Sequence, residues 1–218
     1  MTNKKQNYQK QLDSILQQID ATGQKPSLLL HACCGPCSSY VLEYLCSHFE
    51  ITVLFYNPNI YPVQEYERRL EELKKFYTKF VPAKNVVVVE APYDPEDFYK
   101  AVGTREQPEL ANEPERGERC RRCYELRLRY TYNYAAAHNF DYFCTTLSIS
   151  PFKDADMINE IGNALAVPAV PELVEGPRWL PSDFKKKNGF KRSLELSAEY
   201  NLYRQEYCGC IYSLSLNK

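Results

Sequence analysis

Hydrophobic and polar residues follow one another along the chain in blocks that predict short strands separated by helices. Apolar runs typical of buried strands lie at residues 27–32, 51–56, 85–93 and 140–149. Apolar residues at helical spacing lie at residues 4–21, 38–49, 63–80, 94–102, 120–139, 150–166 and within 182–203. Strands that alternate with helices predict an α/β fold, with a parallel sheet flanked by helices.

Two stretches interrupt this pattern. Residues 103–119 are polar and contain Gly and Pro, and residues 167–178 read VPAVPELVEGPR. Both compositions are typical of loops, and the second is rich in Pro. The chain contains no internal repeat, so we expect residues 1–218 to form a single domain. We also expect a C-terminal extension that folds back, because the widely separated cysteine pairs would otherwise have no shared target.

Composition limits the possible partners and locations. The net charge is −1, so the chain has no global cationic field, and binding to a nucleic acid would need local basic patches. No apolar run reaches the length of a membrane span. The N-terminus reads as an amphipathic helix rather than a signal peptide. We therefore expect a cytoplasmic protein with no membrane partner.

The nine cysteines are the most informative residues. A disulfide framework is not expected in a reducing compartment, where clustered cysteines point to metal or redox chemistry. Seven of them stand in three close groups: Cys33, Cys34 and Cys37; Cys120 and Cys123; and Cys208 and Cys210.

Four interpretations of these cysteines compete. A thioredoxin-like dithiol would use Cys34 and Cys37 of CGPC and leave five clustered cysteines unexplained. A structural zinc site would need only four of the seven. Burial as small hydrophobic side chains suits Cys46 and Cys144. An iron–sulfur cluster beside a second metal would use all seven, because thiolates are the usual cluster ligands. A non-catalytic iron–sulfur or zinc protein that binds RNA is a further alternative.

Candidate substrate residues follow the predicted strands. The segments CCGPC, NPNIYP and SISPFKD come after the first, second and fourth strands, and the carboxyl ends of parallel strands meet at one edge of a sheet. His31 is either a proton donor to the substrate or a satisfied strand-end histidine. The arginines of RCRRC would offset thiolate charge. The candidates for substrate contact are Tyr56, Asn57, Asn59, Lys153 and Arg204.

Six segments together resemble the QueH family, the cobalamin-independent epoxyqueuosine reductases of tRNA queuosine biosynthesis. They are HACCGPCSSYVLEYL, VLFYNPNIYPVQEYERR, RCRRCYELRL, TTLSISPFKD, WLPSDFKKKNGFKRSLELS and YRQEYCGCIYS, and the likeness runs from about residue 27 to residue 214. The resemblance implies a nucleotide-binding-like α/β fold of the PP-loop (HUP-like) kind. In it, CCGPC stands where such enzymes have a phosphate loop. The Pro-rich stretch at 167–178 departs from the family pattern, and the resemblance therefore implies that it is an inserted loop.

The resemblance also implies a reaction and its cofactors. The reaction is the two-electron deoxygenation of epoxyqueuosine to queuosine in a tRNA anticodon loop, with electrons from an unidentified donor. The cofactors are a 4Fe–4S cluster and an adjacent mononuclear iron, onto which the C-terminal extension would fold. Some members have Asp in place of Cys37, so the identity of the second metal stays open. The expected cluster ligands are Cys120, Cys123, Cys208 and one of Cys33 and Cys34, and the expected iron ligands are the other of that pair, Cys37 and Cys210.

Overall fold

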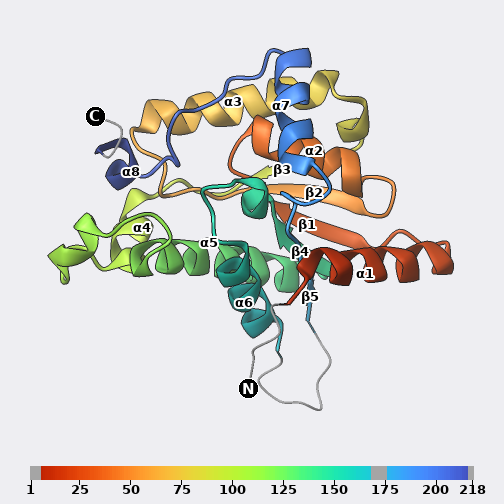
Figure 1. The fold of residues 1–218 in the computed structure, drawn as a ribbon, viewed down its shortest axis with the longest axis horizontal. Coiled ribbons are helices and arrows are strands. Elements are labelled where there is room, and N and C mark those ends of the chain that lie inside the picture. Colours follow the sequence, from red (N-terminus) through yellow and green to blue (C-terminus); the bar gives the residue numbers. More distant parts are fainter. Residues whose placement is uncertain (1–5, 168–175, 216–218) are drawn as a thin grey trace.

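A parallel sheet organises the chain, as the periodicity predicts. The computed structural model describes residues 6–167 and 176–215. Its five strands lie in the order β3-β2-β1-β4-β5, and every neighbouring pair is parallel (Figure 1). The strands are β1 (Ser27–His31), β2 (Glu50–Phe55), β3 (Val87–Glu90), β4 (Tyr142–Thr145) and β5 (Arg178–Trp179).

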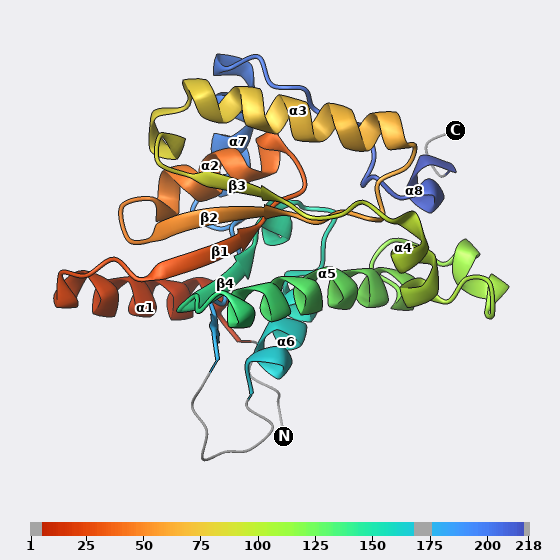
Figure 2. The same ribbon diagram turned by 180° about the vertical axis from the view of Figure 1, so that it is seen from behind.

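Helices cover both faces of the sheet, which confirms the predicted α/β architecture. The α-helices are α1 (Tyr8–Thr22), α2 (Gly35–Leu45), α3 (Val63–Lys79), α4 (Pro95–Val102), α5 (Glu118–Ala137), α6 (Ala155–Ala166), α7 (Gly189–Glu199) and α8 (Ile211–Ser215). The short 3-10 helices are η1 (Val81–Ala83), η2 (Pro108–Asn112) and η3 (Thr146–Ile149). Figures 1 and 2 show α2, α3 and α7 on one face of the sheet and α5 and α6 on the other.

Alternation along the strands produces a hydrophobic core on each face. In β1, Leu28 and Leu30 pack in the core formed with α1, α2 and α3, whereas Leu29 packs with α5 and α6. Successive side chains of a strand point to opposite faces, so a strand covered on both sides is apolar at every position. This explains why the three positions between Ser27 and His31 in the run SLLLH are all leucine.

The strand β5 was not predicted, because two residues are too short to show a period. Arg178 and Trp179 pair with β4, and the Trp179 indole N–H donates to the Asn159 side-chain oxygen at 3.1 Å. Gly162 of α6 lies against the indole, where a Cβ would clash with the ring. The interpretation of residue 178 as part of a loop is therefore wrong.

Other boundaries differ from the predicted ones. The fourth strand ends at Thr145, since η3 takes the last four predicted positions. The helix α1 begins after Asn7, whose side chain accepts a hydrogen bond from the Lys10 backbone N–H, and it ends at Gly23. Most of the predicted insertion, residues 168–175, lies outside the described residues, and the single-domain organisation stays a prediction. Within residues 6–167 and 176–215, no helix combines the length and hydropathy needed to cross a bilayer.

Candidate metal centre and cavity

The first cysteine group lies where β1 ends and α2 begins. The sulfurs of Cys33, Cys34 and Cys37 all lie within 4.8 Å of one another, so they could hold a metal ion. A contact from the Cys33 thiol, 3.9 Å away, holds the pKa of Cys34 well below its usual range, and Arg69 lowers it further. Gln205 also donates to the Cys34 sulfur at 3.1 Å. This sulfur is thus the one best stabilised as a thiolate in its group.

The second and third groups lie close to each other. Cys120 and Cys123 occupy the first turns of α5, and Cys123 shares a hydrophobic cluster with Cys210. Burial raises the pKa of Cys123 to about 11, and the charges of Cys208 and Cys120 raise it too. Gly209 joins the C-terminal pair with a φ of 121°, a conformation that favours glycine.

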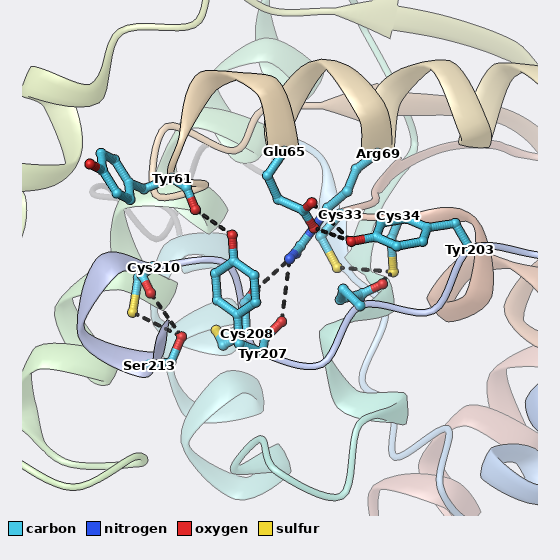
Figure 3. A network of polar contacts seen from close by, with 11 residues as sticks. Cys33, Cys34, Tyr61, Glu65, Arg69, Tyr203, Tyr207, Cys208, Cys210 and Ser213 are labelled. Carbon is cyan, nitrogen blue, oxygen red and sulfur yellow. Dashed lines mark hydrogen bonds and ion pairs between the residues drawn. The ribbon is translucent and has the colours of Figure 1, made fainter. Parts of the chain in front are cut away.

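Arg69 attaches the C-terminal cysteines to α3. Its side chain is buried and donates from Nη1 to the Cys208 carbonyl at 3.1 Å and from Nη2 to the Tyr207 carbonyl at 3.3 Å. Its Nε donates to a carboxylate oxygen of Glu65 at 2.6 Å (Figure 3). One guanidinium group therefore positions the segment that carries Cys208, which lies far from α3 in the sequence.

Two further buried cations lie among the sulfurs. Lys153 donates from Nζ to the Cys208 sulfur at 2.6 Å; although burial alone would lower the pKa of Lys153, the charge of Cys208 raises it. Burial likewise opposes the charge of Arg127, but Cys123, Cys208 and Cys33 raise its pKa. Arg127 therefore neighbours one cysteine of each group. Its Nη2 has no hydrogen-bond partner among the described residues.

A cavity of about 400 Å³ opens beside these residues. Cys33, Cys37 and Cys208 line it, together with Arg127 and Lys153. The segments predicted to meet after the first and fourth strands therefore do meet, and the C-terminal cysteine segment joins them. Thiol groups and buried cations around one cavity can serve metal-dependent redox chemistry.

The comparisons with known proteins identify the family. Residues 28–216 match the family model described as epoxyqueuosine reductase QueH. The chain belongs to the QueH family. A relative from Staphylococcus epidermidis with that name is 40% identical over 98% of this chain and 87% of its own length. Another from Streptococcus pyogenes is 40% identical over 98% and 80%, and one from Thermotoga maritima is 32% identical over 86% and 90%. The predicted resemblance to QueH is confirmed.

Both ring nitrogens of His31 have hydrogen-bond partners inside the protein. Its Nδ1 lies 2.8 Å from the Thr145 hydroxyl, and its Nε2 lies 3.1 Å from the Tyr56 carbonyl, which can only accept. The proton therefore belongs on Nε2, and the Thr145 hydroxyl donates to Nδ1. Burial lowers the pKa of His31 to about 4. The ring is neutral at pH 7, and His31 is not part of the cavity lining.

The residues after β2 are buried away from the cavity lining. The Tyr56 hydroxyl donates to Asp97 at 3.0 Å, and the Asn57 side-chain N–H donates to the Ala32 carbonyl at 2.9 Å. Asn59 is also buried, and neither of its polar side-chain atoms has a partner among the described residues. The cavity lining contains none of the three predicted residues of this segment.

Lys153 and Arg204 do line the cavity, but both side chains have partners inside the protein. Lys153 binds Cys208, and Arg204 donates from Nη1 to the Ser197 hydroxyl at 3.1 Å. Their predicted role in substrate contact stays a prediction.

The arginines beside the thiols, Arg69 and Arg127, are not ones that RCRRC contains. Arg119 donates to the Leu110 and Ala111 carbonyls, and Arg122 donates to the Val102 carbonyl. Sequence reasoning missed Arg127, although a signal was present. Arg127 follows Cys120 by seven residues and Cys123 by four, which is the spacing of one helix face.

Proposed function

We propose that this chain is an epoxyqueuosine reductase that acts on a tRNA anticodon loop. The reaction replaces both carbon–oxygen bonds of the epoxide by a carbon–carbon double bond, consumes two electrons and two protons, and releases water. The observation that carries the proposal is the QueH match over residues 28–216, shared with relatives of that name. An external reductant must supply the electrons, and its identity stays open.

The residues present fit an iron–thiolate centre. Arg127 and Lys153 are buried cations, and a buried charge is stable only beside compensating charge. The unpartnered Nη2 of Arg127 supports an additional hydrogen-bond acceptor at this point. When bound, a 4Fe–4S cluster would pass on the electrons of the external reductant, and an adjacent mononuclear iron would supply a Lewis-acid position.

We propose the same division of ligands as the resemblance implies. The cluster ligands are Cys120, Cys123, Cys208 and one of Cys33 and Cys34, and the iron ligands are the other of that pair, Cys37 and Cys210. Cys210 and Cys123 belong to one hydrophobic cluster, which favours a second division, in which Cys210 joins the cluster ligands and Cys33, Cys34 and Cys37 hold the iron.

The variant Cys210→Ala distinguishes the two divisions. In the first it keeps the visible absorbance of the cluster and lowers the iron content by about one atom per chain. In the second it removes the cluster absorbance. Both predict loss of turnover, so full absorbance together with full turnover would contradict any metal role for Cys210.

Three buried side chains near the metal centre have roles of their own in the proposed reaction. Arg127 lines the cavity with a free N–H donor, which can stabilise an oxygen as negative charge develops on it. Lys153 adds a second positive charge beside Cys208. Because His31 is neutral and bonded at both nitrogens, we propose that it positions the ends of β1, β2 and β4 rather than donating a proton.

We also propose a HUP-like relation for the fold, a C-terminal extension and a cytoplasmic location. The strand order and the position of CCGPC between β1 and α2 support a HUP-like relation, because such folds bind phosphate after the first strand. The bonds from Arg69 to residues 207 and 208 support a C-terminal extension that folds back on the metal centre. The cytoplasmic location is part of the same proposal.

Turnover of the modified tRNA tests the function. Protein purified without oxygen is given a chemical reductant and tRNA that contains epoxyqueuosine, and the nucleosides are then analysed by mass spectrometry. The proposal predicts conversion of epoxyqueuosine to queuosine. Colourless, zinc-loaded protein without turnover would support the non-catalytic RNA-binding alternative. Activity that survives loss of Cys120 and Cys208 would support the thioredoxin-like one.

A further inference from the structure

Phe152 is an exposed aromatic residue at the cavity. Of the ten phenylalanines it alone is exposed, at 66%, and the other nine are buried or half-buried. A single exposed apolar side chain is common in proteins and needs no function by itself. Phe152 differs from the other exposed large hydrophobic residues in the described part of the chain because it alone lines the cavity.

The backbone around Phe152 is held in place. The Phe152 N–H donates to the Ser150 hydroxyl at 3.3 Å, and the Lys153 N–H donates to the Ser150 carbonyl at 3.1 Å. From the opposite side, Arg116 donates to the carbonyls of Pro151 and Phe152. These bonds fix the backbone of the loop between η3 and α6.

The phenyl ring itself has no such partner. Among the described residues, no ring pair and no cation–π contact includes Phe152. An exposed ring on a fixed backbone is arranged to receive a ligand at a low conformational-entropy cost. Lys153, the next residue, lies beside Cys208, so a ligand on the ring would border the metal centre.

The cavity has the character of a nucleoside site. Its volume of about 400 Å³ falls within the range of roughly 300–1,000 Å³ that encloses small organic ligands. Arg127, Lys153 and Arg204 line it, but so do the carboxylates of Glu115 and Glu206. Cations and carboxylates together do not bind a neutral nucleobase by electrostatics alone. Binding the base of an RNA ligand therefore needs a flat apolar surface in the cavity.

We propose that Phe152 is a stacking platform for a nucleobase of the RNA substrate at this cavity. The inference rests on the proposed function, and it adds a substrate-binding residue to it. Aromatic side chains stack on unpaired bases, and each such contact contributes about 1–3 kcal/mol to binding. Loss of the ring should therefore weaken tRNA binding by about 5- to 150-fold.

Steady-state kinetics of the metal-loaded protein test this role. Phe152→Ala should raise KM for epoxyqueuosine tRNA by about 5- to 150-fold and change kcat by less than about twofold, because stacking acts on binding. Phe152→Tyr keeps a ring and should stay within about twofold of the parent, whereas Phe152→Leu should resemble the alanine variant. Val81→Ala, at a residue 78% exposed outside the cavity lining, is the matched control and should change nothing. An unchanged KM in Phe152→Ala, or an equal loss in Phe152→Tyr, would overturn the proposal.

Fluorescence gives a readout that does not require turnover. The chain has one tryptophan, Trp179, which is buried. In Phe152→Trp, substrate tRNA should quench the new indole, while the emission of Trp179 in the parent stays constant. Absence of quenching at tRNA concentrations shown to bind would overturn the platform. Quenching without any conversion of epoxyqueuosine by the parent would instead overturn the proposed reaction and leave the platform supported.

Discussion

Replacement of Arg69 by Met tests how the distant cysteine segment is positioned. The substitution keeps an unbranched side chain in the buried position and removes the guanidinium group. Four interactions are lost with it: the bonds to the Cys208 and Tyr207 carbonyls, the ion pair with Glu65, and the contact with the Tyr207 ring at 5.2 Å. The first two connect α3 to the segment that carries Cys208.

The size of the effect follows from burial. Removing one partner of a buried ion pair costs about 3–5 kcal/mol, since the other charge stays behind. Here the side chain of Glu65 is only 10% exposed, but it keeps a hydrogen bond at 2.9 Å from the Tyr203 hydroxyl. We therefore expect a value at the lower end, about 3 kcal/mol, with the lost bonds to the carbonyls included in it.

The assay is urea unfolding without oxygen, combined with iron analysis of the same samples. Arg68→Met is the matched control, because Arg68 lies on the same helix, is exposed, and contacts the Tyr203 ring at 3.4 Å rather than the cysteine segment. We expect the control to lose at most about 1 kcal/mol and to keep its iron. If Arg69→Met and Arg68→Met had equal unfolding free energies and full iron content, Arg69 would not position Cys208.

Three further predictions concern single buried side chains. Cys208→Ala should lose iron and turnover, whereas Cys144→Ala should keep both, because Cys144 packs inside β4 away from the cavity lining; equal iron contents would contradict this. Asn159→Ala should lower the unfolding free energy by about 3–6 kcal/mol, because four hydrogen bonds of its buried amide are lost, and a urea-measured change below about 1 kcal/mol would refute the reasoning. Because the pKa of His31 falls from 6.5 to about 4 on folding, the unfolded chain binds a proton that the native state excludes. The unsubstituted protein should therefore lose stability by about 1.4 kcal/mol per pH unit as pH falls from 6.5 towards 4, and His31→Gln should lack this slope. Identical pH profiles of the two proteins would contradict the lowered pKa of His31.

The strand–helix alternation and the meeting of segments at one sheet edge could be predicted because both follow from local patterns. The apolar runs of β1 and β2 each end at a candidate segment, and parallel pairing then places the ends of β1 and β4 side by side. The three cysteine groups were equally visible, since their spacing is unusual for packing alone. Each of these inferences needs only neighbours in the sequence.

The roles of the buried cations could not be predicted in the same way. Arg69 bonds to residues 138 and 139 positions away, and Lys153 bonds to Cys208, which lies 55 positions away. Such contacts depend on where the C-terminal segment returns to the sheet. For His31 the sequence left two roles open, a proton donor or a satisfied strand-end histidine, and only the three-dimensional structure shows a partner at each ring nitrogen.

The iron content of catalytically active protein tests the central claim most directly. The claim is that the seven clustered cysteines hold both a 4Fe–4S cluster and an additional mononuclear iron. Protein purified without oxygen and active on epoxyqueuosine tRNA should contain about five iron atoms per chain. Active protein with about four iron atoms, or with zinc in place of iron, would contradict the two-centre account.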